Sequence, residues 1–260
     1  YIIVGGMPKS LAVYIENGRD FMAADVEKRR ILGLYRSDIM KIDEDYRSRV
    51  LDIFDRIPSL LARQDKRVVL REMEKGASFP VYEDTFFWLK DSMIANECFN
   101  CTDPNIGLSM NLDHTFIKCY MGDTGLLVSL AFNENELSDG SLFREILFKK
   151  LSINEGMLFE NVIMQMLVAA GHRPFFYVRY NRTQHRNDIE IDFLISNKSK
   201  LNHKVFPIEV KSAERYATTS LSRFREVFHA RIGNSYVIHP KNLKVEDGVI
   251  YLPAYMTYCL

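Results

Sequence analysis

The fold of the second half of this chain is decided by two short apolar runs, Ile189-Glu190-Ile191-Asp192-Phe193-Leu194-Ile195 and Val205-Phe206-Pro207-Ile208-Glu209-Val210-Lys211. Both runs carry β-branched or aromatic residues at most positions, which is typical of buried β-strands. Successive side chains of a strand point to opposite faces, so Glu209 and Lys211 share one face of the second run. By the same alternation, Asp188, Glu190 and Asp192 share one side of the first run.

Ionised side chains are costly to bury in apolar strands unless they have a partner. Carboxylates that converge can hold a hard divalent cation, and a nearby lysine can steady a water molecule or a phosphate. Asp192, Glu209 and Lys211, with Glu160 from a preceding helix, therefore form a candidate site for metal-dependent cleavage of phosphodiesters. A structural ion network, in which Glu160 caps a helix or pairs with Lys211, is the alternative interpretation of the same residues.

The stretch from Gly156 to Phe224 resembles the PD-(D/E)XK nuclease superfamily. In that superfamily an acidic residue on a first helix precedes an Asp on a strand and a Glu-x-Lys pair on the next strand. Glu160 matches the helix acid, Asp192 matches the strand acid, and Glu209-Val210-Lys211 matches the pair.

The resemblance implies a role for each matched residue. Glu160, Asp192 and Glu209 would bind Mg²⁺ or Mn²⁺, with the carbonyl oxygen of Val210 as a further ligand. Lys211, Glu209 and Asp192 would be the catalytic residues. Lys211 would orient the attacking water or stabilise the charge that builds on the phosphate.

Six motifs in the same order cover nearly the whole chain and are similar to the C-terminal part of predicted prokaryotic AAA-type ATP-binding proteins. That resemblance implies an N-terminal P-loop ATPase domain, absent from this chain, and a winged-helix element before the nuclease-like domain of unknown function. Lys9 departs from the family pattern, which tends to carry an acid there. The motifs are Gly5-Gly6-Met7-Pro8, Tyr35-Arg36-Ser37-Asp38-Ile39, Lys118-Cys119-Tyr120-Met121-Gly122-Asp123-Thr124-Gly125-Leu126-Leu127, Leu158-Phe159-Glu160-Asn161, Glu190-Ile191-Asp192-Phe193 and Ile208-Glu209-Val210-Lys211-Ser212.

We expect no ATP site in this chain. The stretch Gly6-Met7-Pro8-Lys9-Ser10 lacks the Gly-x-x-x-x-Gly-Lys spacing of a phosphate-binding loop. Pro8 also lacks the amide hydrogen that such a loop uses to bind phosphate.

The composition is that of an ordinary globular protein, with 47% hydrophobic and 26% charged residues and a formal net charge of zero. Residues 171–231 nevertheless hold twelve Lys or Arg against six Asp or Glu, an excess of six positive charges. A basic surface around an acidic centre suits a polyanion, although a solvated basic face is the simpler reading. We therefore expect nucleic acid, favouring DNA, or a protein as the partner, with Arg182 and Arg186 as candidate nucleic-acid contacts.

No run of residues approaches the roughly 18 apolar residues that a membrane span needs. The first residues, Tyr1 to Val4, lack the basic leader of a signal peptide, and the absence of an initiator Met suggests part of a longer protein. Four cysteines do not suggest a disulfide framework. We expect a cytoplasmic protein with no membrane partner.

The predicted fold class is α/β, or α+β over the whole chain. A helical segment (1–57) and a winged-helix-like domain (58–131) precede a linker at 132–139. A restriction-endonuclease-like αβββαβ domain (140–260) follows. Expected helices in the first part are 26–40 and 43–57, the latter ended by Pro58, then a further short helical stretch that begins at 60–62, and helices 67–75 and 81–93. Hairpin strands 94–101 and 114–121 follow. In the second part we expect helix 154–170, strands 175–180, 189–195 and 205–211, helix 220–228, strand 235–238 and an edge strand at 249–252.

A second function fits the same pattern, because nuclease folds also serve as non-catalytic binding modules. In that case the chain would recognise DNA or a partner on behalf of the ATPase. The helix 81–93 would face the groove in a DNA-binding winged helix, yet its outward residues Glu83, Asp84, Lys90 and Asp91 are mostly acidic. Acids repel phosphate, so we expect this helix to pack against protein and the basic segment to meet DNA.

Overall fold

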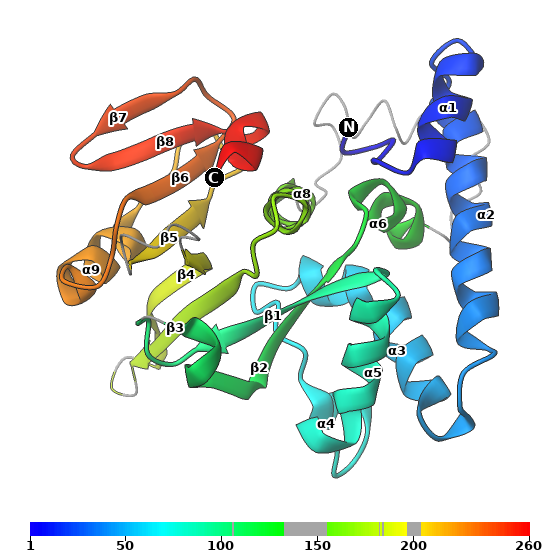
Figure 1. Ribbon diagram of the computed structural model, residues 1–260, viewed down its shortest axis with the longest axis horizontal. Helices are drawn as coiled ribbons and strands as arrows, with labels where there is room; N and C mark the ends of the chain where they lie inside the picture. Colours follow the sequence, from blue (N-terminus) through cyan, green and yellow to red (C-terminus); the bar gives the residue numbers. More distant parts are fainter. Residues whose placement is uncertain (106, 133–154, 182, 184, 197–203) are drawn as a thin grey trace. The chain divides into compact units, whose positions relative to one another are not determined.

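The computed structural model describes residues 1–105, 107–132, 155–181, 183, 185–196 and 204–260 (Figure 1). The chain forms two compact units that are interleaved in sequence. Unit 1 comprises Tyr1–Glu97 and Lys118–Gln165, and unit 2 comprises Cys98–Ile117 and Met166–Leu260. The predicted linker lies outside the described residues from position 133 onward.

Unit 1 is mainly helical. Helix α1 packs against α2, α2 packs against α6, and α3 packs against α5. Its described helices are α1 (Pro8–Glu16), α2 (Phe21–Ile39), α3 (Glu44–Ala62), α4 (Leu70–Met73), α5 (Phe79–Asp91), α6 (Thr124–Ala131) and most of α8 (Glu155–Ala169). The expected helices at 26–40, 43–57 and 81–93 are therefore confirmed as α2, α3 and α5.

Helix α3 continues through Pro58, so the prediction that this proline ends the helix was wrong. Proline removes one backbone hydrogen bond and normally kinks or breaks a helix. Here Ile53 and Ile57 before it and Leu61 after it are fully buried along one stripe. Burial of this stripe outweighs the local cost and keeps the chain helical.

The predicted helix at 67–75 is reduced to the single turn of α4. Arg67 instead forms an antiparallel bridge with Lys118 of strand β2 (Leu112–Met121). The β-branched Val68 and Val69 follow, and such residues favour extended backbone over helix. Helices α1 and α6 were not predicted at all.

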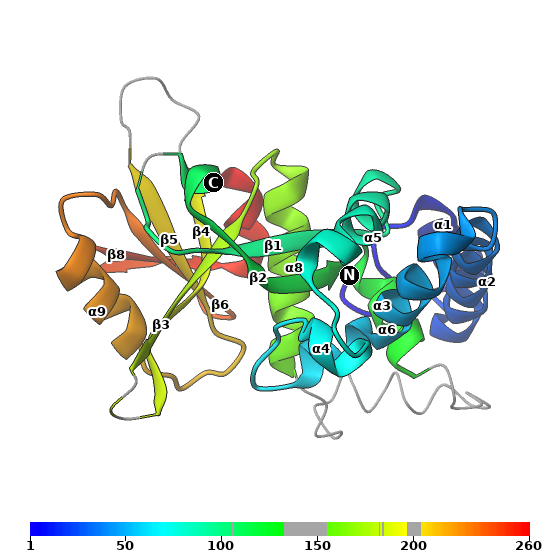
Figure 2. The same ribbon diagram turned by 90° about the horizontal axis from the view of Figure 1, so that it is seen from below.

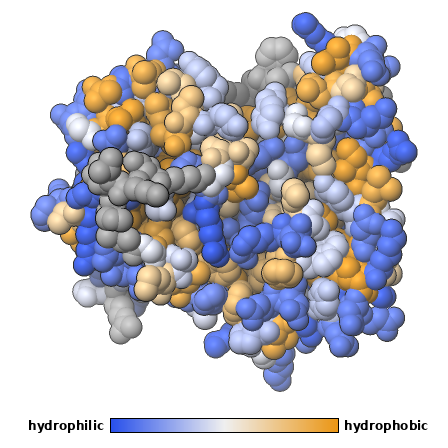
Figure 3. All heavy atoms as spheres, viewed as in Figure 1, coloured by the Kyte–Doolittle hydropathy of each residue, from blue (hydrophilic) through white to orange (hydrophobic). Residues whose placement is uncertain are grey.

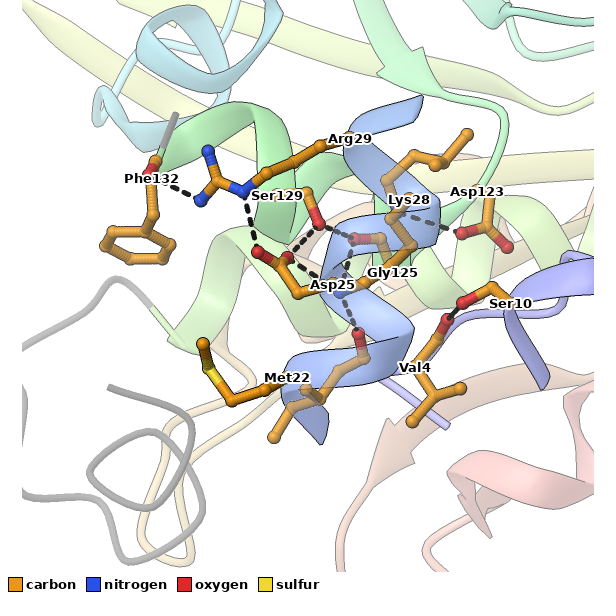
Figure 4. A network of polar contacts seen from close by, with 12 residues as sticks. Val4, Ser10, Met22, Asp25, Lys28, Arg29, Asp123, Gly125, Ser129 and Phe132 are labelled. Carbon is orange, nitrogen blue, oxygen red and sulfur yellow. Dashed lines mark hydrogen bonds and ion pairs between the residues drawn. The ribbon is translucent and has the colours of Figure 1, made fainter. Parts of the chain in front are cut away.

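A buried polar network joins α2 to α6 and to the first residues of the chain (Figure 4). The ammonium of Lys28, which is fully buried, donates to the carbonyl of Ile3 at 2.7 Å and lies 3.4 Å from the carboxylate of Asp25. Asp25 also accepts from Ser129 at 2.6 Å and from Arg29 at 2.7 Å. Burial lowers the pKa of Lys28, and the charge of Asp25 opposes that shift. Each charge has a partner of opposite sign, as buried charges require.

The N-terminal segment meets the start of α6 at very short range. Asp123 caps α6 by accepting from the backbone of Leu126 at 2.9 Å, and it also accepts from the backbone of Gly6 at 2.6 Å. Gly5 has a φ of 80°, and a Cβ on it would lie 2.2 Å from the Asp123 carboxylate. A Cβ on Gly125 would lie 2.5 Å from the nitrogen of Gly5. Two motifs of the sequence thus fit together through backbone contact.

Unit 2 is built on a mixed sheet. Strands β3, β4 and β5 pair antiparallel, whereas β5, β6 and β8 run parallel. The strand order is β2-β1-β3-β4-β5-β6-β8-β7. The strands are β1 (Ala95–Cys101), β2, β3 (Phe175–Asn181), β4 (Arg186–Ser196), β5 (Val205–Val210), β6 (Ser235–His239), β7 (Lys244–Glu246) and β8 (Val249–Pro253).

Helix α9 (Thr219–Phe228) packs against the sheet at β4, as Figure 2 shows. The rings of Phe224 and Phe228 lie 5.3 and 5.4 Å from the ring of Tyr177 on β3. The order helix α8 (Glu155–Ala169), three strands, α9 and β6 follows the predicted αβββαβ sequence of elements. The molecule is therefore mixed α/β, with a helical N-terminal part and a mixed sheet in the C-terminal part.

The edge of the sheet was predicted wrongly. Strand β8 lies between β6 and β7, so the short strand β7 forms the edge. The turn between them is Asp247-Gly248, with φ values of 49° and 71°. Asp-Gly is a strong signal for a tight hairpin turn, and it could have revealed β7 in the sequence.

Exposed apolar side chains gather on the outer surface of α1 and α2, where Figure 3 shows hydrophobic atoms. They include Leu11, Ile15, Val26 and Leu34, which are 42–66% exposed. None of the described helices is both long and apolar enough to cross a membrane.

Candidate functional site

Strands β4 and β5 bring two of the predicted acids to one place in unit 2. Their antiparallel pairing runs to Phe193 opposite Ile208, and Asp192 and Glu209 are the next residues beyond that pair. The carboxylate Oδ2 of Asp192 accepts a hydrogen bond from the backbone nitrogen of Val210 at 2.8 Å. Asp192 therefore lies against the end of β5 that carries Glu209.

Glu209 is 4% exposed and is paired with Lys211, and a backbone hydrogen bond from Leu221 also lowers its pKa. Its Oε1 lies 2.7 Å from the Lys211 ammonium, which confirms that the two side chains share a face. Its Oε2 is buried without a hydrogen-bond partner among the described residues. Burial raises the pKa of Glu209, while Lys211 opposes the shift and the charge of Glu190 adds to it.

An open carboxylate oxygen in a buried position is unusual, because buried polar atoms nearly always have a partner. Such an oxygen is free to accept a proton or to bind a hard cation, which prefers oxygen ligands. Asp192, Glu209 and the Val210 carbonyl supply that type of donor set. Within the described part of the chain, however, no group of three or more His, Cys, Asp or Glu side chains is placed to hold a metal ion.

Glu160 belongs to α8 and to unit 1, where both of its oxygens have partners. Its Oε1 accepts from the hydroxyl of Tyr120 and lies 3.6 Å from Lys118, and its Oε2 is paired with Lys66. Burial would raise the pKa of Glu160, but the charges of Lys118 and Lys66 outweigh it and lower the pKa. The role of Glu160 as a metal ligand stays a prediction.

No sequence signal marked Lys66 or Lys118 as partners of Glu160. They lie 94 and 42 residues before it in the chain. The next residue, Asn161, bonds both backbone groups of Met121, accepting at 2.9 Å and donating at 3.1 Å. The motif around Glu160 thus fixes α8 to β2 inside unit 1.

Two arginines not singled out from the sequence join the predicted basic surface of unit 2. Arg179 of β3 and Arg223 of α9 both bond the carboxylate of Asp188, at 2.5 and 2.7 Å. The hydrogen bond from Arg179 is the main cause of the lowered pKa of Asp188, and Arg186 contributes. Arg186 is exposed at the start of β4, whereas Arg182 lies outside the described residues.

The acidic residues of α5 face outward as expected. Glu83, Asp84, Lys90 and Asp91 are all exposed. Lys90 is paired with Glu97 of β1, which leaves no excess of positive charge among these residues. This surface is unsuited to bind phosphate.

Two family models match the sequence. The first, described as "Domain of unknown function (DUF8612)", matches residues 1–137, which is more than half of the chain. The chain belongs to this family. The second, "Domain of unknown function (DUF4143)", matches residues 155–256 and is a C-terminal region of AAA-ATPase-associated proteins. No curated protein and no solved structure matched the chain.

Proposed function

We propose that unit 2 carries a metal-dependent nuclease site that cleaves phosphodiesters of nucleic acid, DNA in the first instance. The observation that carries the proposal is the Glu209 carboxylate. It is buried beside Asp192, bonded to Lys211 through one oxygen, and open at the other. A buried acid of this kind is costly to the fold, and sites of this kind are frequently functional.

The order of α8, β3, β4, β5, α9 and β6 supports a PD-(D/E)XK nuclease-like domain as the scaffold. Helix α5 followed by β1 and β2 supports a winged-helix element before it. The DUF4143 match supports a function alongside an ATP-binding AAA-type domain outside this chain. We place the protein in the cytoplasm, since its four cysteines are free thiols.

The residues fit a hard divalent cation such as Mg²⁺ or Mn²⁺. Asp192, Glu209 and the Val210 carbonyl, all in unit 2, would hold it. When bound, such an ion lowers the pKa of a water molecule and polarises the phosphate. Lys211, already placed 2.7 Å from Glu209, would stabilise the negative charge that develops on the phosphate oxygens.

The basic surface would position the nucleic acid. Arg179 and Arg223 are held by Asp188, so their guanidinium groups are ordered before any phosphate arrives. Each guanidinium has five N–H donors, which leaves donors for phosphate oxygens. Arg186, and Arg182 as predicted, would extend this surface.

Titration calorimetry with Mn²⁺ tests the site. Wild type should release or absorb heat on binding, and Asp192→Ala should lose that signal. Glu226→Ala, which removes an exposed acid from α9, is the control and should bind as wild type does. Equal heats from wild type and Asp192→Ala would remove the metal site from this proposal. A cleavage assay with linear and branched substrates then tests the reaction.

A second function is favoured by the basic surface, because it needs no metal ion to bind nucleic acid. Arg179 and Arg223 are both held by Asp188, and a non-catalytic nuclease-fold module would use them in the same way. Such a module would bind DNA or a protein partner for the ATPase through the same basic surface. Retained DNA binding with neither Mn²⁺ heat nor cleavage would select this function.

A further inference from the structure

A histidine–tyrosine pair borders the candidate site and was not singled out from the sequence. His239 ends strand β6 and is 1% exposed. Its Nδ1 lies 2.6 Å from the hydroxyl oxygen of Tyr216, and its Nε2 lies 3.2 Å from the carbonyl oxygen of Asn242. A buried imidazole with both nitrogens bonded is held in one orientation.

The two hydrogen bonds assign the roles of the pair. The carbonyl of Asn242 can only accept, so Nε2 of His239 carries the proton. Burial lowers the pKa of His239, and Lys241 and Lys244 lower it further, which favours the neutral ring. Nδ1 is then an acceptor, and Tyr216 donates to it. The phenolic oxygen keeps its lone pairs for another donor.

Strand β6, which ends at His239, pairs with strand β5, which carries Glu209. The backbone nitrogen of Lys211 donates to the carbonyl of Ile238, the residue before His239, at 2.9 Å. Tyr216 lies in the segment that leads from Lys211 to α9. Burial is the main cause of its raised pKa, and the Glu209 charge is near enough to contribute.

The proposed nuclease site needs a group that accepts a proton from the attacking water. Lys211 is an ammonium paired with Glu209, and a protonated lysine cannot accept. Asp192 and Glu209 are assigned to the metal. A neutral imidazole is the usual proton acceptor in enzymes, and His239 is one such group beside this site.

We propose that Tyr216 and His239 form the proton relay of this site, an inference that rests on the proposed function. The proton of the water moves to the Tyr216 oxygen while the phenolic proton moves to Nδ1 of His239. The freed electron pair of the water oxygen forms the bond to phosphorus. The bond from phosphorus to the leaving oxygen breaks, and that oxygen keeps its electron pair and takes a proton from solvent. The imidazolium, bonded to the Asn242 carbonyl, then returns its proton through Tyr216.

Other titratable groups lie near His239. Tyr251 of β8 lies with its ring 5.7 Å from the imidazole, and Lys244 of β7 is paired with Glu246. Lys211 follows Val210 on the neighbouring strand, and Tyr255 and Tyr258 beyond β8 are exposed. The titratable groups with a described interaction with the ring are Tyr216, Tyr251, Lys241 and Lys244.

The test compares Tyr216→Phe with Tyr251→Phe. Both variants remove one hydroxyl from a tyrosine near the His239 imidazole, but only Tyr216 is hydrogen-bonded to it in the described structure. Tyr216→Phe should lower the Mg²⁺-dependent cleavage rate about 100-fold, as loss of general-base catalysis does. It should also abolish the rise of rate with pH that accompanies titration of His239. Mn²⁺ binding by calorimetry should be unchanged. Nitrogen NMR of His239 should show Nδ1 losing its hydrogen bond in Tyr216→Phe and keeping it in Tyr251→Phe.

Each outcome decides one of two questions. If wild type shows no metal-dependent cleavage, the proposed function fails, and the relay with it. If wild type cleaves and Tyr216→Phe stays within twofold of its rate, the relay alone is overturned. If Tyr216→Phe does not fold, the wild-type pH profile takes its place. The titration of the His239 imidazole is then followed by NMR. A cleavage rate that does not change over the pH range of that titration overturns the relay.

Discussion

Two buried glutamates, one in each unit, have the same exposed fraction of 4%, but their pKa values are shifted in opposite directions. Glu160 in unit 1 is surrounded by Lys66, Lys118 and Tyr120, and its pKa is lowered. Glu209 in unit 2 has Lys211 on one oxygen and no described partner on the other, and its pKa is raised. Burial acts on both carboxylates in the same direction, so the number of cations around each decides the result.

The comparison separates two uses of a buried charge. A carboxylate with all its bonds made is a structural element, and removing it leaves other charges unpaired. A buried carboxylate with an oxygen that lacks a hydrogen-bond partner weakens the fold. Such a group is frequently found at functional sites, where a ligand can bind to the open oxygen. Glu160 has the bonds of the first kind in the described structure, and we propose that Glu209 is of the second kind.

The largest effect should follow from Glu160→Gln. This change leaves Lys66 and Lys118 without their carboxylate, and breaking a buried pair costs about 3–5 kcal/mol of unfolding free energy. The loss should be full at pH 7. It should shrink below pH 4.5, the ordinary Glu value, since wild type loses the same interaction as pH falls through the lowered pKa. Urea unfolding across this range measures it, and a loss under 1 kcal/mol at pH 7 would contradict the assignment.

Metal should stabilise the fold through Glu209. Mn²⁺ at 100 times its dissociation constant should add about 2.7 kcal/mol to the stability of wild type. Glu209→Gln and Asp192→Ala should show no such gain in a thermal melt. A gain that survives in both variants would place the metal elsewhere.

A smaller effect of opposite sign is expected for Glu209→Gln without metal. Ionising Glu209 in its buried position opposes folding, so the neutral amide should be more stable than wild type by about 1 kcal/mol at pH 7. Because the folded pKa is raised, the difference should vanish as pH falls below 4.5, where both forms are uncharged. If Glu209→Gln is less stable than wild type at pH 7, Glu209 is structural and resembles Glu160.

The smallest effect concerns the two charged surfaces. Arg186→Glu should weaken DNA binding and lower the salt slope by about one unit or more, because a phosphate contact is lost. Lys90→Glu on α5 should leave both quantities unchanged. Fluorescence anisotropy at several salt concentrations provides the comparison. Loss of binding in Lys90→Glu with retention in Arg186→Glu would make α5 the DNA-reading element.

Much of the fold follows from short-range pattern. Strands β4 and β5 and helices α2 and α3 have clear apolar periods, and their ends fall within a few residues of the predicted ones. The Glu209–Lys211 contact also follows from alternation along one strand. By contrast, α6 is apolar on nearly every side, so it has no period to detect.

The rest depends on contacts between distant segments. The Lys66–Glu160 pair and the Tyr216–His239 bond join residues 94 and 23 positions apart. Nothing in the spacing of these residues indicates a contact, because tertiary packing decides which side chains of distant segments meet. Continuation of α3 through Pro58 has the same cause, since packing overrode the local preference.

The close approach of Gly5, Asp123 and Gly125 has an evolutionary consequence. A side chain at either glycine would collide with its neighbour, and loss of the carboxylate would uncap α6. Relatives should therefore keep or change these three positions together, as covarying sites a hundred and more residues apart. Their invariance in an alignment would report a steric constraint, and it would not by itself mark a reaction centre.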